Sequence, residues 1–500
     1  MPATMPLSRA TLTELDPRII RPSYLDEKVG NGILHLGVGN FHRAHQAVYT
    51  DTMLNAGDHR WGIVGVNLHS HALRDRLVAQ DFLYSVLALS ADSSDVNAGD
   101  TGPSADTNEL RIIGSLNDVL ALPQCGTQAI IEHIANPATQ VITLTITEKG
   151  YCLANGELDA SHPDVVHDLA HTDPPRTALG LLALGLAARS ARKAGPITLL
   201  SCDNLLGNGQ VLAKVLNAFV AASQPALSSW LTDHVRCCSS MVDRIVPATE
   251  ASATQQFNLQ DEARVICEPF SQWVIEEQFA GLRPPWELAG AQWVSDVGPF
   301  EQAKLRLLNA SHSALAYLGL LTNHEYIHQA LAVPAIRSFI DQLFKAELVP
   351  LVQAPQGMDL TQYVTTIISR FSNSAVPYTT AQVATDGAQK LPQRILPSLR
   401  QAYQQDHPRQ GLLLVLAAWL QCLNGKSDGG GPVSVNDPLA QDLRDYLATH
   451  TPSPDGLIQF ALNETPHFSL LAHYSAFAAE LTTALHTLRK RGTYAAIAAV

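Results

Sequence analysis

Residues 300–319 read FEQAKLRLLNASHSALAYLG, a stretch without proline whose only glycine stands at its end. Such a stretch predicts a helix of about five turns. At about 100° per residue, Glu301 lies roughly 60° from Lys304 around the helix axis, and His312 lies roughly 80° from it in the same direction. Asn309 follows at about 140°. We therefore expect these four polar side chains to share one face of a leucine-rich helix.

Burial of this face would make Lys304 a usable base, because the loss of water favours the neutral amine. The alternative is an ordinary helix whose lysine extends to water and whose His312 and Asn309 are core polar groups with partners. Four polar groups on one arc favour the functional interpretation, since burying several of them without partners costs too much free energy to be incidental.

The composition is that of an ordinary globular protein of two or three domains, with 500 residues of which 46% are hydrophobic. The net charge of −13 argues against nucleic acid or an anionic membrane as the main partner. The seven cysteines show no metal-binding spacing, and their odd number fits a reducing cytoplasm. Residues 1–22 lack the apolar segment of a signal peptide, and the longest apolar runs, near 179–188 and 412–420, are too short to span a bilayer. We expect a cytoplasmic protein, either a monomer or a small homo-oligomer.

Residues 32–45, GILHLGVGNFHRAH, predict the start of a dinucleotide-binding βα unit. Gly37 and Gly39 follow a short apolar run, and glycines at such a turn let backbone amides approach a pyrophosphate at the N-terminus of the next helix. His42 stands where the third glycine of the usual fingerprint would be, so a plain strand–turn–helix connection stays open as the alternative. A second strand, expected at 62–67, arrives at the spacing of a βαβ unit.

The end of that second strand lacks the acidic residue that commonly holds the ribose of NAD. Residues 68–74 read LHSHALR, and the first carboxylate is Asp75. Without the acid a 2′-phosphate is repelled less, and Arg74 or Arg76 could attract one. These residues therefore leave NAD and NADP both open.

Two further expected strands end in polar clusters, 140–147 in TEKGY and 196–202 in SCDN. In an open parallel sheet such strand ends face the ligand crevice. The chain alternates strands and helices to about residue 295 and is almost wholly helical beyond it. We therefore expect an α/β protein with a Rossmann-type dinucleotide-binding domain at 1–295 and a mostly α-helical domain at 296–500. The helix at 300–319 would then present its polar arc to the first domain, with the substrate between cofactor and base.

Two segments are expected to lie outside this framework. Residues 91–108, rich in Ser, Asp and Gly, predict a surface loop, and residues 424–432 predict a disordered insert. Other kinds of site fit less well. The histidines near the N-terminus have no cysteine or paired carboxylate beside them and predict no metal, and no Gly-x-Ser-x-Gly elbow of a hydrolase is present.

Several motifs occur in a fixed order along the chain. They are GVGNFHRAH (37–45), TITEKGY (145–151), SCDN (201–204), MVDRIVP (241–247), CEPF (267–270), Lys304-x4-Asn309-x2-His312 and Asp386-Gly387-x2-Lys390. In this combination, from about residue 15 to the end, the chain resembles the long-chain polyol dehydrogenases, the mannitol dehydrogenase family. The resemblance implies metal-independent hydride transfer between a nicotinamide cofactor and a polyol or sugar acid.

The resemblance also implies roles for the groups around the reacting carbon. Lys304 would be the general base, and Glu301 would relay its proton towards water. Asn309 and His312 would position and polarise the reacting oxygen, with help from Asn204. An amine of near-neutral pKa can remove the proton of a secondary alcohol without a metal.

Further residues are implied in binding. Asp243 and Lys390 would bind other substrate hydroxyls; from the sequence alone, Asp243 is equally compatible with a structural ion pair and Lys390 with an exposed turn lysine. The implied cofactor residues are Gly37, Val38, Gly39, Asn40, Phe41, His71 and Glu148. Relatives that prefer NAD have acidic residues where His71 and Ala72 stand, so NAD is expected by family habit alone and NADP stays open.

Within the family, Gln382 and the run 390–394 are similar to the members that reduce D-fructuronate to D-mannonate. Mannitol 2-dehydrogenases carry an arginine at the place of Gln382 and a glycine at the place of Lys149. A uronate has a carboxylate that fructose lacks, and Lys149 or Arg394 could hold it through a charge-assisted contact. In the alternative, Lys149 points to solvent and Arg394 pairs with a surface acid.

Other functions stay open beside fructuronate reduction. Within the family these are a mannitol 2-dehydrogenase and an arabinitol-type dehydrogenase. Outside it, a non-catalytic sugar- or nucleotide-binding protein would keep the fold without needing Lys304. A metal-dependent sugar isomerase would need a ligand set that the sequence does not offer.

Overall fold

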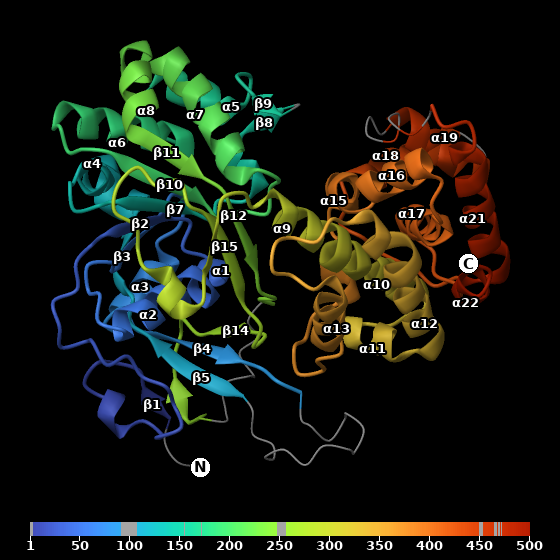
Figure 1. The fold of residues 1–500 in the computed structure, drawn as a ribbon, viewed down its shortest axis with the longest axis horizontal. Coiled ribbons are helices and arrows are strands. Elements are labelled where there is room, and N and C mark those ends of the chain that lie inside the picture. Colours follow the sequence, from blue (N-terminus) through green and yellow to red (C-terminus); the bar gives the residue numbers. More distant parts are fainter. Residues whose placement is uncertain are drawn as a thin grey trace. The chain divides into compact units, whose positions relative to one another are not determined.

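The computed structural model describes residues 4–91, 108–154, 156–171, 173–247, 257–449, 454–464, 468, 471 and 473–500. The chain divides into two compact units, Met1–Gly298 and Pro299–Val500, called unit 1 and unit 2 below (Figure 1). Unit 1 contains a parallel sheet with helices, and unit 2 is mostly helical. The α/β class, with a Rossmann-type part followed by a helical part, is therefore confirmed.

Unit 1 is built on a six-stranded sheet in which every neighbouring pair of strands is parallel. Its order is β11 (Val235–Cys238), β10 (Ile197–Ser201), β7 (Val141–Leu144), β2 (Ile33–Leu36), β3 (Ile63–Asn67) and β6 (Leu116–Ala121). The direction in which the chain adds strands reverses at β2. In such sheets a ligand crevice forms outside the carboxyl ends of the strands at this reversal, here those of β2 and β7.

Both faces of this sheet are covered by helices, which is why its strands read as continuous apolar runs. Successive side chains of β2 point to opposite faces. Ile33 packs in the core that holds residues of α1 (Asn40–Ala44) and α2 (Gln46–Asn55), whereas Leu34 and Leu36 pack in the opposite core. That second core holds residues of α4 (Leu122–Ile134), α6 (Ala178–Ala191) and α7 (Asn208–Ser223).

Unit 1 also contains two three-stranded sheets and two two-stranded ones, β1 (Met5–Pro6) with β13 (Leu259–Gln260) and β8 (Leu153–Ala154) with β9 (Glu157–Leu158). One three-stranded sheet has the order β12 (Ser240–Asp243), β15 (Gln272–Glu276), β16 (Gln292–Val294), and the other β14 (Val265–Cys267), β4 (Tyr84–Ala88), β5 (Glu109–Ile113). A short apolar run at 264–267 predicts a strand that corresponds to β14, whereas no strand is expected from the sequence where β4, β5, β15 and β16 lie. Each of the three-stranded sheets joins strands that lie far apart along the chain, and local patterns carry no information about such pairing. The loop expected at 91–108 falls, apart from its two end residues, outside the described residues.

Unit 2 surrounds two buried helices, α10 (Ala310–Leu321) and α17 (Gln410–Leu423), which pack against each other. The other helices in the order of the chain are α9 (Gly298–Ala303), α11 (Ile327–Ala332), α12 (Pro334–Gln342), α13 (Leu360–Phe371), α14 (Thr380–Ala384), α15 (Gly387–Arg394), α16 (Leu396–Gln405), α18 (Leu439–Thr449), α19 (Pro454–Glu464), α21 (Phe477–Arg491) and α22 (Thr493–Ile497). One continuous hydrophobic core runs through the unit.

The expectation of a disordered insert at 424–432 is wrong. The Asp428 backbone N–H donates to the carbonyl of Leu321 at 3.0 Å, and the Asp428 carboxylate accepts from the Thr493 N–H at 2.6 Å. Lys426 and Pro432 form an isolated bridge that closes the loop. The segment is therefore an ordered loop that links the ends of α10 and α22.

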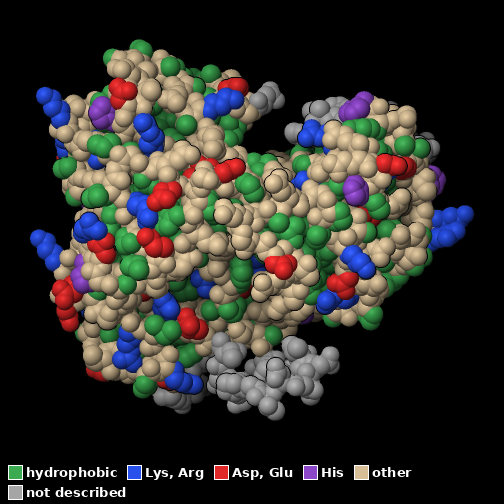
Figure 2. All heavy atoms as spheres, in the orientation of Figure 1, with side chains coloured by type: hydrophobic (Ala, Val, Ile, Leu, Met, Phe, Trp, Pro, Cys, Tyr) green, Lys and Arg blue, Asp and Glu red, His purple; other side chains and the backbone are tan. Residues whose placement is uncertain are grey.

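Among the described residues, no helix has both the length and the apolar character that a membrane span requires. Figure 2 shows acidic and basic side chains interspersed over the face that it displays. This mixture agrees with the moderate charge content of the sequence.

Candidate active site

Unit 1 contains a cavity of about 690 Å³ at the carboxyl ends of β2, β3 and β7. Most of its wall comes from four segments: 36–40 at the end of β2, 67–73 after β3 without His71, 145–150 after β7 without Glu148, and 176–178 at the start of α6. Arg43, Arg76, Cys152, His162 and Asp164 also line it. Its size lies in the range of small-molecule and cofactor sites, and its position is the strand-order reversal of the central sheet.

The backbone after β2 requires one glycine for the fold and carries a second that the fold does not require. Gly37 has φ +94°, and a Cβ there would lie 2.2 Å from the carbonyl oxygen of Thr145. A Cβ on Gly39 would meet only the Gly37 carbonyl oxygen, at 3.9 Å. Packing therefore explains Gly37, whereas Gly39 leaves the backbone open to a group in the cavity, as a pyrophosphate at a helix N-terminus requires.

A pair of buried histidines packs beside the glycine loop at 37–39. His35 and His42 stack with ring centroids 3.4 Å apart, and both are fully buried. The His35 ring nitrogens lie 2.7 Å from Thr143 Oγ1 and 3.2 Å from the Gly37 carbonyl oxygen. Burial lowers the pKa of His35 to about 3, so the ring is neutral and serves packing and hydrogen bonding. Within the described part of the chain, no three His, Cys, Asp or Glu side chains gather in a way that could hold a metal ion.

The end of β3 carries an amide where NAD-binding proteins often carry an acid. Asn67 lines the cavity, and its Oδ1 accepts from the Val38 N–H at 3.0 Å. Asp75 contacts His71, with 2.6 Å between His71 Nδ1 and Asp75 Oδ2. Neither residue lines the cavity. Arg76 does line it, whereas Arg74 does not. Arg76 is therefore the arginine of the two that a 2′-phosphate in this cavity would meet.

The remaining residues predicted for unit 1 are distributed as follows. The cavity is lined by Gly37, Val38, Gly39, Asn40 and Lys149. Phe41 and Glu148 do not line it: Phe41 stacks on His45, and Glu148 begins the 3-10 turn Glu148–Tyr151. Asn204 follows β10 and is exposed, and Asp243 is buried at the end of β12.

In unit 2 the helix at 300–319 is present but not regular. Between α9 and α10, residues Lys304–Asn309 form a turn of π-helix, called the Lys304 π turn below. A π turn contains one extra residue, so everything after it is rotated back by about 100° relative to a regular helix. Asn309 therefore lies at about 40° from Lys304 instead of 140°, and His312 at about −20° instead of 80°. With Glu301 unchanged at about 60°, the four side chains occupy a narrower arc than the sequence predicts.

All four side chains of this arc are buried, with 6% of Glu301, 7% of Lys304, 9% of Asn309 and 6% of His312 exposed. The His312 ring stacks on Phe371 with centroids 4.6 Å apart and lies 5.0 Å from the Tyr378 ring. These contacts fix the imidazole plane.

Helix α15, which carries Lys390 and Arg394, packs against the Lys304 π turn. Both side chains are half-buried, and Arg394 Nη1 donates to Ser313 Oγ at 3.0 Å, one residue beyond His312. Gln382 is exposed on α14. The fold of unit 2 thus brings the two cations of α15 into the region of Lys304, Asn309 and His312, although about 80 residues of the chain lie between the two groups.

Arg306 is a residue of this region that the sequence did not single out. It lies inside the Lys304 π turn, and its guanidinium donates to Ser398 Oγ and Gln401 Oε1, both at 2.8 Å. Burial lowers the pKa of Arg306 to about 10. These bonds anchor the π turn to α16, and no local sequence signal distinguishes this arginine from a surface one.

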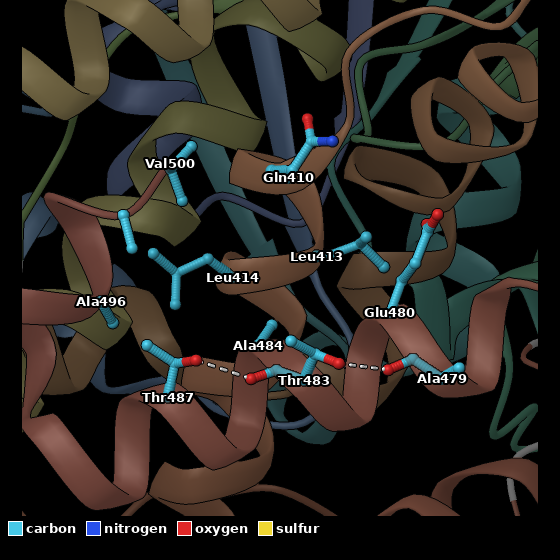
Figure 3. A pocket seen from close by; sticks show the side chains of 11 residues that line it. Gln410, Leu413, Leu414, Ala479, Glu480, Thr483, Ala484, Thr487, Ala496 and Val500 are labelled. Atoms are coloured by element: carbon cyan, nitrogen blue, oxygen red, sulfur yellow. Dashed lines mark hydrogen bonds between the residues drawn. The ribbon is translucent and has the colours of Figure 1, made fainter.

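A second cavity, of about 310 Å³, lies in unit 2 between α17 and α21 and is bordered by Ala496 and Val500 (Figure 3). The hydroxyls of Thr483 and Thr487 donate to carbonyls of their own helix at 2.8 and 2.9 Å. The cavity therefore presents mainly apolar surface, and none of the predicted site residues lines it.

The parallel sheet, the glycine loop in its crevice and the buried lysine–asparagine–histidine helix define a nicotinamide-dependent dehydrogenase class. Residues 31–288 match the Mannitol dehydrogenase Rossmann domain, and residues 296–489 match the Mannitol dehydrogenase C-terminal domain. The chain belongs to the mannitol dehydrogenase family, and it is an oxidoreductase.

Three relatives illustrate the range of the family around this chain. D-mannonate oxidoreductase from Escherichia coli (strain K12) is 38% identical over 88% of this chain and 90% of its own length. Mannitol 2-dehydrogenase from Phaeosphaeria nodorum is 37% identical over 99% of this chain and 86% of its own. The structure of Pseudomonas fluorescens mannitol 2-dehydrogenase in ternary complex with NAD and D-mannitol superimposes with a TM-score of 0.88, at 35% identity and 99% coverage of both chains.

Proposed function

We propose that this enzyme reduces D-fructuronate to D-mannonate. The observation that carries the proposal is Lys149, a cation in the wall of the cavity at the end of β7. Arg394, anchored beside His312, is a second candidate for the same carboxylate. The similarity to a D-mannonate oxidoreductase supports the proposal, whereas the mannitol 2-dehydrogenases at comparable identity support mannitol oxidation as the second candidate.

The reaction is proposed to use NADH or NADPH, which supplies the hydride when bound in the cavity of unit 1. Lys304 gives the proton to the forming hydroxyl during reduction and takes it back during oxidation, with Glu301 as the relay towards water. Asn309, His312 and Asn204 hold and polarise the carbonyl oxygen by donating hydrogen bonds. Asp243, Lys390 and Gln382 bind the other substrate hydroxyls. None of these steps requires a metal.

A substrate panel tests this function. Oxidation or reduction of the cofactor is followed at 340 nm with fructuronate, fructose and mannitol, with and without EDTA. We expect the highest kcat/KM with fructuronate and no effect of EDTA. Equal activity with fructose would make mannitol 2-dehydrogenase the better description. Loss of activity in EDTA would favour a metal-dependent enzyme, and binding without turnover of any of these substrates would favour a non-catalytic protein.

The cofactor end of the cavity predicts weak discrimination between NADH and NADPH, because Arg76 faces it and Asp75 does not. Arg76→Ala should raise the KM for NADPH at least about tenfold with little change for NADH, since a charge-assisted hydrogen bond to the 2′-phosphate contributes roughly 1.5–3 kcal/mol. Arg74→Ala is the matched control, because Arg74 lies on the same helix outside the cavity lining. An unmutated preference for NADH above about a thousandfold, roughly 4 kcal/mol, would contradict the prediction.

A further inference from the structure

Thr147 has a backbone conformation that its residue type strongly disfavours. Its φ is +62° and its ψ is +167°. In the same unit Gly126 adopts almost the same angles, φ +72° and ψ +166°, as glycine can without a steric penalty. For a β-branched residue this region is a genuine outlier, and such strain persists only where the surroundings hold it. Thr147 lines the cavity directly after β7, so the strain lies in the wall of the candidate site.

One buried carboxylate holds both ends of the turn that begins at Thr147. Asp203 Oδ1 accepts from the Thr147 N–H at 2.8 Å, and Asp203 Oδ2 accepts from the Tyr151 hydroxyl at 2.8 Å. Oδ2 also accepts from the Ile146 N–H at 3.2 Å. Tyr151 is fully buried, and only 8% of Asp203 is exposed. Asp203 therefore closes the turn 147–151 at its entry and at its exit.

The turn has little room to rearrange while these bonds persist. The Gly150 N–H donates to the Thr147 carbonyl oxygen at 3.0 Å, and a Cβ on Gly150 would lie 2.9 Å from the Ile146 side chain. Lys149 stands between the two closed ends and lines the cavity. The position of its ammonium group thus depends on a turn whose conformation Asp203 maintains.

We propose that Asp203 is a positioning residue that holds the strained turn at Thr147 and thereby fixes Lys149 in the cavity wall. What Lys149 then binds, the carboxylate of a uronate, rests on the proposed function. Asp203 also immediately precedes Asn204, so the same carboxylate lies next to a second residue implied in substrate binding. The alternative is a buried aspartate that only stabilises unit 1.

A double-mutant cycle separates these interpretations. Asp203→Ala should lower kcat/KM for fructuronate about twentyfold and change that for fructose much less, because Lys149 is no longer held. Thr147→Gly removes the strain, so the effect of Asp203→Ala in the Thr147→Gly background, measured relative to Thr147→Gly alone, should fall to about threefold. Tyr151→Phe removes one of the three donors and should give a smaller effect of the same kind if Asp203→Ala folds poorly.

Two control variants exclude general effects. Asp51→Ala removes another buried aspartate of unit 1, which accepts from the Tyr24 hydroxyl at 2.5 Å and from the Gly114 N–H at 3.0 Å. It should lower thermal stability and leave the ratio of the two substrates unchanged. Lys193→Gly relieves a positive φ of +54° at an exposed site, and it should not rescue Asp203→Ala. An unchanged fructuronate-to-fructose ratio in Asp203→Ala, or equal rescue by Lys193→Gly, would overturn the proposal.

Hydrogen exchange gives a readout that does not depend on the substrate. Amides 146–151 should exchange faster in Asp203→Ala than in the unmutated protein, and Thr147→Gly should restore most of the protection. If the unmutated enzyme shows no preference for fructuronate, the proposed function fails. Hydrogen exchange alone then tests whether Asp203 holds the turn 147–151. Unchanged exchange in Asp203→Ala would then refute it.

Discussion

Lys304→Ala should lose at least a hundredfold in kcat with every ketose or polyol that the enzyme accepts, while the affinity for NADH stays within about twofold. The reason is that a positioned general base or acid contributes typically 10²–10⁴ to the rate. Lys304 belongs to unit 2, whereas the cavity with the glycine loop belongs to unit 1. Lys304 is not among the residues that line this cavity, so we expect the substitution to impair proton transfer and to leave cofactor binding nearly unchanged.

The chain offers a matched control for this variant. A second π turn, Leu343–Leu348, carries Lys345, which is exposed and far from the predicted arc in the sequence. Lys345→Ala should keep full activity. Added primary amines should restore part of the turnover of Lys304→Ala, because a small amine can occupy the space that the side chain leaves. If Lys304→Ala keeps more than about a tenth of the wild-type turnover, which corresponds to less than about 1.4 kcal/mol of barrier, the assignment of the base is wrong.

The arc around Lys304 also shows how far sequence periodicity reaches. The residue types and their approximate facing follow from the sequence, because 300–319 has the composition of a helix and its polar residues recur on one side. The π turn does not follow from it. No proline or glycine marks Lys304–Asn309, and the extra residue is stabilised by tertiary contacts such as the bonds from Arg306 to Ser398 and Gln401. A 100° rotation of everything beyond the turn is therefore invisible to a helical projection.

The same reasoning explains the errors elsewhere. The parallel strands β2, β3, β7 and β10 are buried on both faces and read as apolar runs, so they can be predicted locally. The loop at 424–432 has a composition typical of disorder, but its order comes from hydrogen bonds of Asp428 to Leu321 and Thr493, which are remote in sequence. The role of Asp203 likewise depends on where Thr147 and Tyr151 meet it. Composition carries no record of such partners.

The second large effect is expected on kcat/KM for fructuronate when the cation that binds its carboxylate is removed. Lys149→Met removes the charge and keeps most of the unbranched side chain, and Arg394→Met removes the guanidinium and leaves a shorter, uncharged side chain on α15. If one of these cations binds the acid group of fructuronate, its replacement should lower kcat/KM for fructuronate by roughly 2–3 kcal/mol, or about 30- to 150-fold. The value for fructose should change little, because fructose has no carboxylate to lose a partner.

Two controls make the comparison specific. Ser313→Ala removes the partner of Arg394 Nη1 but keeps the guanidinium, so a loss seen in Arg394→Met but not in Ser313→Ala belongs to the charge and not to the anchoring bond. Lys214→Met removes a half-exposed lysine whose partner is Glu157, at 2.6 Å, and reports any effect of net charge. We expect Lys149→Met to show the larger selective loss, since Lys149 lies in the cavity wall and Arg394 already donates to Ser313. If neither methionine variant lowers the fructuronate-to-fructose ratio, the carboxylate is bound elsewhere, and the case for a uronate substrate loses the observation on which it rests.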